Sequence, residues 1–555
     1  MILRIVLLVI LNTLAIAAFH APLKTQNGAV ASDHPIASVI GNEILKEGGN
    51  AFDAAIATAI ALGVLNPHSS GIGGGDFIMF FRVGEPNVKV FDCRESAPMA
   101  ITRKHYFVDG KFNTQLSQRG GLAVAVPGEL KCLDLLHKKY GTISWDKLLQ
   151  PAIKLASEGA EVSHYFRGIL SKYVASFQKD PVIKKVFYPN NRVPEVGSLI
   201  RMPALANTLK IIAQEGPEVF YEGEIAEAIV DTVRKNGGVM TIADLKNYKV
   251  RELQALKGTY SGTTVYTMPP PSSGGLILLQ MLDVLSHFPL KSWGHNSSKS
   301  IHHITEAMKH AYAFRAEFMG DDRFVKIPFD SLRSSATIKG IVNDIKSSIT
   351  TKATDHYGEV FLKDDHGTTH FSVTDRHGNA VAYTATINTF FGAKLGVPGY
   401  GILLNNEMDD FSLNLNVPNA YGLLGSEANQ IAPNKKPLSS MSPTIVLRNG
   451  KLDMVLGGSG GPRIISGVLQ VLLNSLIYGM DAQSAVGSPR FHHQWIPEYL
   501  FLESEIPLDV WSGLIGRGHL TRHLKMRNVI QLIQIRNDWI ESASDPRKGG
   551  RPAGY

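Results

Sequence analysis

Hydrophobic residues recur at helical spacing in the first part of the chain, and short strand-like runs follow them. Residues 33–67 predict two helices separated at Gly48-Gly49, because glycine commonly ends a helix. The second helix, residues 51–65, is apolar on every side but short for a membrane span, so we expect it in the core. The runs "GDFIMFFRV" and "NVKVFDCRE" come next and predict strands.

The pattern changes twice more along the chain. Residues 128–320 have mostly helical spacing, and Thr241 stands where it would cap one of these helices. From Thr368, runs such as "TTHFSVTD", "AVAYTATI" and "LDMVLGG" predict strands, until a helical pattern returns at residues 465–479. Strands occur in both halves without the regular alternation of a doubly wound fold. This arrangement favours the α+β class, with helices covering sheets.

One predicted pair of strands has a polar face. A Gly-Asn loop separates residues 368–374 from residues 380–386, which predicts a hairpin centred on His377. Three pairs then face one another: Thr368 with Thr386, His370 with Thr384, and Ser372 with Ala382. Period-two alternation puts the polar members of these pairs on one face. Considered alone, such a face is more typical of a strand that faces solvent.

The same face becomes catalytic if the chain is cut before Thr368. A threonine hydroxyl is a poor nucleophile unless a base lies beside it. Cleavage of the Gly367-Thr368 bond would create an α-amino group with a pKa of about 8, which suits a general base near neutral pH. The preceding Asp-His-Gly sequence is compatible with an accessible cleavage point.

Two glycine-rich runs, "SSGIGGGDF" at residues 69–77 and "GGSGGPR" at residues 457–463, could bring backbone N–H groups close to a ligand. Neither contains the Gly-Lys-Ser/Thr of a phosphate-binding loop, and the first follows a helix, which argues against a nucleotide site. Stabilisation of an oxyanion is one interpretation of these runs. Tight turns alone account for them equally well.

The histidine pairs His302-His303 and His492-His493 do not predict a metal site, because adjacent residues point in different directions on a helix or strand. We therefore expect neither a metal nor another cofactor. The 56 basic and 49 acidic residues leave a net charge of +7 without a long Lys/Arg run. This charge distribution does not indicate a nucleic-acid partner.

Residues 1–19 predict a signal peptide, with a membrane anchor as the alternative. Arg4 precedes a run of about fifteen apolar residues, and small residues follow it. A membrane-spanning helix needs about twenty residues. We therefore expect an exported protein, either periplasmic or secreted, or else anchored at an extracellular face.

The two cysteines, Cys93 and Cys132, are too few for a disulfide framework in a chain of 555 residues. We expect free buried thiols. A single bridge between them is the alternative, which nothing in the sequence requires.

Several motifs give the chain a family resemblance. The segment "TTHFSVTDRHGNAVAYTATINTFFG" resembles the signature of the γ-glutamyltranspeptidases throughout its length. The motifs "KEGGNAFDAA", "GIGGG", "FDCRESAP", "MPPPSSGG", "NNEMDDFS", "KPLSSMSPTIV" and "GGSGGPRI" stand in that family's order, and "SDPRKGGRPAGY" resembles its C-terminal end. The resemblance covers residues 28–555 and outweighs the local alternatives.

The resemblance implies an N-terminal nucleophile hydrolase fold, a four-layer αββα sandwich of two sheets between helical layers. It also implies a precursor that cleaves itself after Gly367 into a large subunit, residues 20–367, and a small subunit, residues 368–555. The family pattern places the nucleophile two residues before His370. This spacing selects Thr368 over its neighbour Thr369.

The resemblance further implies a role for each matched residue. For catalysis, Thr386 would hydrogen-bond the nucleophile, and the backbone N–H groups of Gly460 and Gly461 would bind the oxyanion. The substrate's α-carboxylate would be bound by Arg94, Ser439 and Ser440, because a planar guanidinium suits bidentate contact. The α-ammonium group would be bound by Asn388, Glu407 and Asp410. Tyr421 stands at the position of the lid tyrosine of bacterial members.

The implied activity is that of a glutathione hydrolase and γ-glutamyltransferase. Thr368 would attack the γ-glutamyl amide of glutathione or its conjugates, and the γ-glutamyl group would pass to water or to an amino acid or dipeptide. The lid segment favours a bacterial-type enzyme. One alternative is a related glutaryl-type amide acylase, which would leave the ammonium-binding acceptors without a donor. The other is an inactive, uncleaved surface protein.

Overall fold

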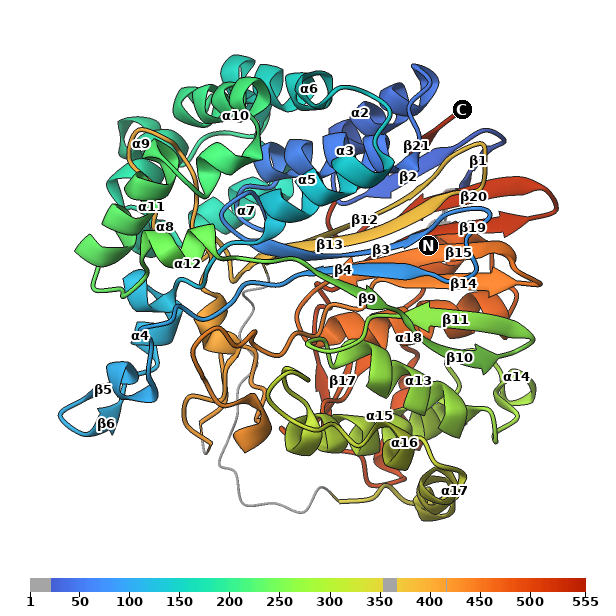
Figure 1. The fold of residues 1–555 in the computed structure, drawn as a ribbon. Coiled ribbons are helices and arrows are strands. Elements are labelled where there is room, and N and C mark those ends of the chain that lie inside the picture. The colour runs from blue at the N-terminus through green and yellow to red at the C-terminus, as the bar shows by residue number, and fades with distance from the viewer. Residues whose placement is uncertain (1–20, 353–366, 416) are drawn as a thin grey trace, which may run out of the picture.

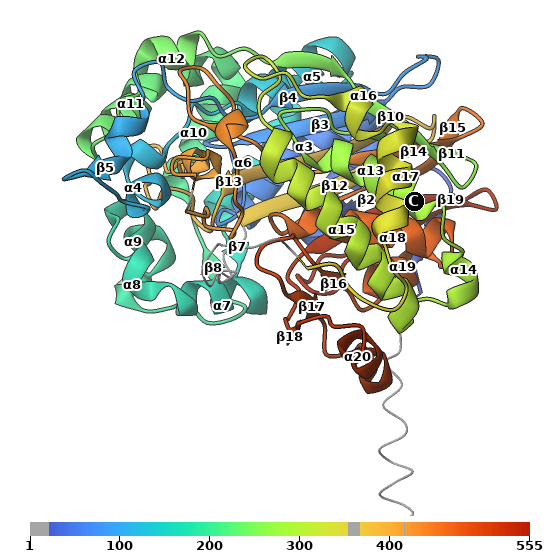
Figure 2. The ribbon, with the colours of Figure 1, turned by 90° about the horizontal axis from the view of Figure 1, so that it is seen from below.

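Two β-sheets lie face to face in the middle of the molecule, and helices cover the outer face of each sheet (Figure 1). This computed structural model describes residues 21–352, 367–415 and 417–555. Seen from below, the helices of one outer layer lie across the strands (Figure 2). The structure confirms the α+β class and the four-layer αββα sandwich.

Each sheet contains seven antiparallel strands drawn from both halves of the chain. The first sheet has the order β1 (Leu23–Thr25), β20 (Trp539–Ser544), β19 (Val529–Arg536), β15 (Lys451–Ser459), β14 (Thr444–Arg448), β11 (Thr263–Thr267) and β10 (Leu256–Tyr260). The second has the order β21 (Ala553–Gly554), β2 (Ala29–Ser32), β12 (Gly367–Thr374), β13 (Ala380–Asn388), β3 (Gly75–Phe81), β4 (Lys89–Cys93) and β9 (Arg251–Gln254). The hairpin β12–β13 therefore lies at the centre of its sheet.

The helical layer on the second sheet comes almost entirely from the first half of the chain. Its longer helices are α2 (Pro35–Lys46), α3 (Ala51–Leu65), α5 (Glu129–Tyr140), α6 (Trp145–Glu158), α7 (His164–Lys172), α10 (Pro203–Glu215) and α11 (Glu224–Lys235). Shorter ones are α4 (Gln115–Gln118), α8 (Val174–Phe177), α9 (Pro181–Phe187) and α12 (Ile242–Lys246). Helix α3 is buried along nearly its whole length, as its all-round apolar sequence predicts.

The other helical layer covers the first sheet. It contains α13 (Gly274–Leu285), α14 (Leu290–Trp293), α15 (Ser298–Phe318), α16 (Phe329–Leu332), α17 (Ser335–Asp344), α18 (Arg463–Leu476) and α19 (Ala482–Gly487). Helix α20 (Leu508–Ile515) and a small sheet of β16 (Phe491–His492), β17 (Leu500–Leu502) and β18 (Thr521–His523) lie beside it. A short hairpin, β5–β6 (Phe107–Val108 and Lys111–Phe112), and a two-stranded sheet of β7 (Ala160–Glu161) and β8 (Leu199–Ile200) complete the described strands.

Most predicted elements are present. The helix break at Gly48-Gly49, the cap at Thr241 and the hairpin register, with Thr368 opposite Thr386, are confirmed. Residues 128–320 are mostly helical, as predicted, but β7 to β11 also lie there. The strands β9, β10 and β11 are only four or five residues long, and β9 and β10 alternate between half-buried and exposed residues, so the sequence shows no strong apolar signal.

The polar face of the hairpin is buried, not solvent-exposed. Every residue of β12 and β13 is buried, because the first sheet covers this face. The sheets approach so closely that a Cβ atom on Gly457 of β15 would lie 2.3 Å from Cε1 of His370. Burial lowers the pKa of His370 to about 3, so its ring is neutral. The solvent-facing interpretation of the stripe was therefore wrong.

The expectation of two free thiols was also wrong. Cys93 and Cys132 form a disulfide that joins the end of β4 to helix α5, with Cα atoms 5.8 Å apart. The two residues are 39 positions apart, and only the packing of α5 against the sheet brings them together. The bridge fixes the backbone immediately before Arg94.

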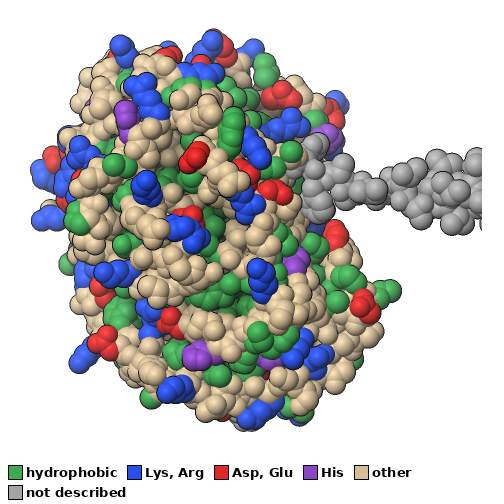
Figure 3. Space-filling view, turned by 90° about the vertical axis from the view of Figure 1, so that its right-hand side faces the viewer, with side chains coloured by type: hydrophobic (Ala, Val, Ile, Leu, Met, Phe, Trp, Pro, Cys, Tyr) green, Lys and Arg blue, Asp and Glu red, His purple; other side chains and the backbone are tan. Residues whose placement is uncertain are grey.

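On the face shown in Figure 3, Lys and Arg side chains are scattered among Asp and Glu side chains. Within the described ranges, none of the helices combines the length and apolar character that a membrane crossing requires. Residues 1–19, the expected signal peptide or anchor, lie outside the described residues.

Replacing both cysteines by serine should lower the free energy of unfolding by about 2–4 kcal/mol, because the unfolded chain loses a cross-link. Differential scanning calorimetry of the wild-type and double-variant proteins measures this effect. Mass spectrometry under non-reducing conditions checks that the wild-type bridge is formed. Equal unfolding temperatures with an intact wild-type bridge would contradict the expectation.

Candidate active site

The residues that the family resemblance singles out come together around one small cavity. Its lining includes Arg94, Thr368, Thr386, Asn388, Glu407, Asp410, Tyr421, Ser439, Ser440 and Gly461. They come from β12, β13, the residue after β4, a 3-10 helix (Glu407–Asp410) and three loops, spread over more than 350 positions of the sequence. Gly460 precedes Gly461 but is not part of the lining.

Thr368 and Thr386 lie opposite each other at the end of the hairpin. Their hydroxyl oxygens are 3.2 Å apart, and the Thr386 hydroxyl also donates to the carbonyl oxygen of Gly367 at 2.7 Å. The backbone N–H of Asn388 donates to the Thr386 hydroxyl at 2.8 Å, which orients it. One hydroxyl thus contacts both the candidate nucleophile and the carbonyl oxygen of the bond that would be cut.

The backbone around Gly367 leaves no room for a side chain. A Cβ atom at this position would lie 2.7 Å from the backbone of Thr389 and 2.8 Å from the carbonyl oxygen of Asn388. The pairing of β12 with β13 is also irregular between Gly367 and Thr368. Glycine is therefore required immediately before Thr368 for the carbonyl to reach Thr386.

Sequence reasoning missed the ion pair that holds the backbone of Thr368. Lys548 donates to the carbonyl oxygen of Thr368 at 2.9 Å and to Oδ2 of Asp33 at 2.6 Å. The hydroxyl of Thr369 donates to the same carboxylate at 3.0 Å. Thr369 is thereby bonded away from the candidate nucleophile. Lys548 lies in the C-terminal motif "SDPRKGGRPAGY". Its place in this motif was the one sign in the sequence that the residue has a role.

Arg94 is bonded to two of the carboxylates expected to bind an ammonium group. It donates to Oε1 of Glu407, to Oδ2 of Asp410 at 2.5 Å, and to the carbonyl oxygen of Pro437 at 3.2 Å. Burial opposes the charge of Arg94, but the two carboxylates outweigh that effect and raise its pKa. Burial raises the pKa values of both Glu407 and Asp410, and Arg94 partly offsets this rise.

Two further charged residues at this cluster were not foreseen. Glu95 lies 3.8 Å from the Arg94 guanidinium, and burial raises its pKa to about 7. Arg315 of α15 also lines the cavity, and burial lowers its pKa to about 10. No local pattern marks Arg315, because only the fold brings α15 beside the loop that carries Asp410.

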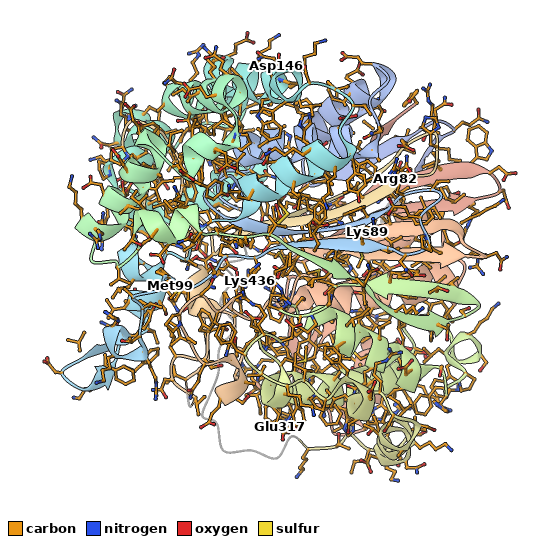
Figure 4. The ribbon with its side chains drawn as sticks, viewed as in Figure 1. Arg82, Lys89, Met99, Asp146, Glu317 and Lys436 are labelled. Carbon is orange, nitrogen blue, oxygen red and sulfur yellow. A yellow bond between two sulfur atoms is a disulfide. The ribbon has the colours of Figure 1, made fainter. Side chains whose placement is uncertain are left out.

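The loop that carries Ser439 and Ser440 is tied to the strand that carries Arg94. Lys436, labelled in Figure 4, donates to Oδ1 and to the carbonyl oxygen of Asp92, each at 3.0 Å. All of these groups are buried. The arginine and the serine hydroxyls are therefore held together before any ligand arrives.

Tyr421 closes the cavity near the hairpin. Its hydroxyl donates to the carbonyl oxygen of Asn388 at 2.8 Å, and its side chain is 5% exposed. The cavity has a volume of about 20 Å³, which is close to the minimum for a single water molecule. A larger ligand therefore enters only after a lining group such as Tyr421 moves.

The described residues also include a cluster of possible metal ligands, His302, Glu306 and His519. Nδ1 of His302 lies 2.8 Å from Nε2 of His519, so one ring donates to the other. The Glu306 carboxylate already accepts hydrogen bonds from Thr350 and Thr351 and lies 3.2 Å from Lys309. These contacts indicate a structural role for the cluster. None of its three residues lines the cavity.

The fold places the Thr368 hydroxyl of β12 between two stacked sheets, and this arrangement belongs to the class of N-terminal nucleophile hydrolases. The cephalosporin acylase from Bacillus halodurans shares the fold, with a TM-score of 0.85 and 27% identity over 97% of each chain. A structure of Helicobacter pylori γ-glutamyltranspeptidase matches with a TM-score of 0.56 and 37% identity, covering 60% of this chain and 93% of that one.

Sequence comparison defines the family. The model described as Gamma-glutamyltranspeptidase matches residues 37–555. The glutathione hydrolase proenzyme of Escherichia coli strain K12 is 41% identical over 533 residues, which is 95% of this chain and 92% of that protein. The chain belongs to the γ-glutamyltranspeptidase family.

Replacing Lys548 by Met should lower the free energy of unfolding by about 3–5 kcal/mol, because Asp33 is left buried without its partner. Adding Asp33→Asn should restore part of this loss, as expected for two groups in contact. Urea unfolding of the single and double variants measures both effects. As a control, Lys235→Met removes the partner of Asp231 in an ion pair that is exposed on both sides and should change stability by less than about 1 kcal/mol. Equal effects of the two lysine variants would contradict the assignment.

Proposed function

We propose that this protein is a self-cleaving γ-glutamyl hydrolase and transferase whose nucleophile is Thr368. The observation that carries the proposal is the Thr386 hydroxyl, which contacts both the Thr368 hydroxyl and the Gly367 carbonyl oxygen. The cavity beside it contains the Arg94 cluster, which can recognise an amino-acid head group.

In the maturation step, the Thr368 hydroxyl oxygen attacks the carbonyl carbon of Gly367. The peptide C–N bond breaks, an ester C–O bond forms, and the released α-amine of Thr368 takes up the proton. Water then hydrolyses the ester, which leaves the Gly367 carboxylate and a free Thr368 hydroxyl. The Thr386 hydroxyl supports this step by donating to the carbonyl oxygen on which negative charge develops.

The products are a large subunit, residues 20–367, and a small subunit, residues 368–555, which stay together as a heterodimer. Both subunits contribute strands to each sheet, and β12 of the small subunit is flanked by β2 of the large one. Separation would expose the hydrophobic residues between the layers.

In turnover, the α-amine of Thr368 acts as the general base for its own hydroxyl. The hydroxyl attacks the γ-carbonyl of glutathione or another γ-glutamyl compound, and the amine of the leaving group departs. The resulting γ-glutamyl ester passes to water or to the amine of an amino acid or dipeptide. Gly460 and Gly461 supply N–H groups to the oxyanion.

The ion pairs around Arg94 suit a zwitterionic ligand. The substrate's α-carboxylate takes over hydrogen bonds of Arg94 and bonds to Ser439 and Ser440, while its α-ammonium group binds Glu407, Asp410 and Asn388. Binding therefore exchanges internal ion pairs for ion pairs with the ligand. A ligand with only one of the two charges cannot complete the exchange and leaves a buried charge unpaired.

We also propose that the protein is exported, with residues 1–19 as the signal peptide or anchor. The Cys93–Cys132 disulfide supports this proposal, because disulfides persist in oxidising compartments such as the periplasm and the cell exterior.

N-terminal sequencing and intact-mass analysis of the purified full chain test the proposed nucleophile. We expect a small fragment that begins at Thr368. Thr368→Ala should abolish both cleavage and turnover, whereas the neighbouring control Thr369→Ser should retain both, because a serine hydroxyl can still donate to Asp33. A fragment that starts elsewhere, or normal cleavage of Thr368→Ala, would overturn the assignment.

Comparing γ-glutamyl and glutaryl anilides tests the proposed head-group recognition and separates it from the glutaryl-type acylase alternative. We expect the γ-glutamyl anilide to be favoured, because the glutaryl group lacks the ammonium. Asp410→Asn should lower kcat/KM for the γ-glutamyl anilide by about tenfold or more, since a charge-assisted hydrogen bond is lost. The control substrate, glutaryl anilide, should respond much less. Equal turnover of both anilides by the wild-type enzyme would favour the acylase.

A further inference from the structure

Arg315 is a buried arginine that forms no ion pair within the described part of the chain. It lies on helix α15, in the helical layer over the first sheet (Figure 1), and is 4% exposed. Its Nε donates to Oγ of Ser273 at 3.0 Å. Arg94 and Arg490, which are also buried, each form an ion pair with a carboxylate. Because a buried charge is costly unless a counter-charge pairs with it, this difference points to a ligand as the partner of Arg315.

The free nitrogens of Arg315 face the candidate active site. Neither Nη atom has a hydrogen-bond partner among the described residues, yet neither belongs to the unpaired atoms that are closed off from solvent. Arg315 lines the cavity that Thr368, Ser439 and Ser440 also line. Because so little of the residue is exposed, its accessible nitrogens open into this cavity. A ligand bound beside Thr368 can therefore reach them.

Hydrogen bonds connect Arg315 to the loop that carries the two serines. Oγ of Ser273, which accepts from Arg315, donates to the carbonyl oxygen of Ser439 at 2.8 Å. The backbone N–H of Ser273 donates to the same oxygen at 2.9 Å. Arg94 donates to the carbonyl oxygen of Pro437, which belongs to the same loop. Two arginines are therefore bonded to the loop to which the substrate's α-carboxylate is assigned.

The position of Arg315 is fixed by a second contact of the same helix. Tyr312 lies one turn before Arg315 on α15, and its hydroxyl donates to the carbonyl oxygen of Pro462. Pro462 follows Gly461, and both residues line the cavity. Helix α15 is thus bonded to two loops of the site through one face. This arrangement preorganises the guanidinium, which lowers the entropic cost of binding a ligand.

Charge decides which group of the ligand Arg315 contacts. Burial lowers the pKa of Arg315 to about 10, and Asp410 opposes this effect, so the guanidinium is still a cation at pH 7. The ammonium group of a γ-glutamyl ligand has the same sign and is repelled. The α-carboxylate is the anionic group of this ligand, and its two oxygens match the paired N–H donors of a guanidinium.

We propose that Arg315 is a specificity-determining residue, which binds the α-carboxylate of the γ-glutamyl group together with Arg94, Ser439 and Ser440. Two guanidinium groups around one carboxylate make the site selective for a free α-carboxylate over a neutral α-carboxamide. The inference rests on the proposed γ-glutamyl function and adds to it a residue that the sequence motifs did not assign.

Two anilides of nearly equal shape test this selectivity: L-γ-glutamyl p-nitroanilide, and the same anilide with an α-carboxamide in place of the carboxylate. Steady-state kinetics give the ratio of kcat/KM for the acid to kcat/KM for the amide. We expect Arg315→Met to lower this ratio by about tenfold or more, because a charge-assisted hydrogen bond to the acid is lost. Isothermal titration calorimetry with L-glutamate and L-isoglutamine measures the same preference without turnover.

Further variants separate binding from a structural role. Arg315→Lys keeps the charge without the planar fork, so its ratio should lie between those of the wild-type enzyme and Arg315→Met. The control Arg376→Met changes an exposed arginine of the β12–β13 loop and should leave the ratio unchanged. Cleavage after Gly367 involves no α-carboxylate, so Arg315→Met should still yield a fragment that begins at Thr368.

An unchanged ratio in Arg315→Met, with the acid and the amide weakened equally, would overturn the inference and indicate a structural role. If Arg315→Met does not fold or cleave, Arg315→Lys decides the question, and an unchanged ratio in that variant overturns the inference. Absence of γ-glutamyl turnover by the cleaved wild-type protein would instead overturn the proposed function, and this inference with it. The wild-type measurement therefore distinguishes the two failures.

Discussion

The structure depends on burial of the polar face of the β12–β13 hairpin between two sheets. Because water is excluded there, each hydroxyl and ring nitrogen needs a partner within the protein. Thr368 pairs with Thr386, and Nδ1 of His370 pairs with the Thr384 hydroxyl at 2.8 Å. A register slip of one residue would turn these groups into the apolar layer on the other side. The requirement that aligns the sheet therefore also aligns the candidate nucleophile with the Gly367 carbonyl.

The buried charged groups around this hairpin also have partners within the protein. The buried ion pairs of Lys548 with Asp33, and of Lys436 with Asp92, hold the backbone beside Thr368 and beside Arg94. The Arg94 cluster differs, because burial raises the pKa values of its carboxylates, and its internal ion pairs are the ones that we propose a ligand replaces. The disulfide at Cys93 anchors the strand that presents Arg94. Rigid pairs thus surround one cluster whose pairing can change.

The other face of the same sheet packs against the apolar helical layer, which contains a cavity of about 560 Å³. Tyr383 of β13 points into the apolar helical layer, toward Asp76 and Glu129, while its neighbour Thr384 points toward the first sheet. Alternation along a single strand therefore places polar groups in both neighbouring layers. The cavity of the candidate active site is small and has charged and polar residues in its lining, whereas the cavity in the helical layer is larger and mainly apolar. Their chemical difference follows from the different layers that cover the two faces.

The sequence by itself determined the elements whose information is local. An apolar run of helical length predicted α3, and the Gly-Asn loop with its flanking alternation predicted the pairing of Thr368 with Thr386. Motifs along the chain indicated the family and the residues that line the active-site cavity. Only the tertiary structure decided that the polar face is buried, that Cys93 bonds to Cys132, that Lys548 holds Thr368 across 180 positions, and that Glu95 and Arg315 join the Arg94 cluster. These outcomes depend on which surfaces the sheets and helices bring together, and contacts between distant residues leave no periodic trace in the chain.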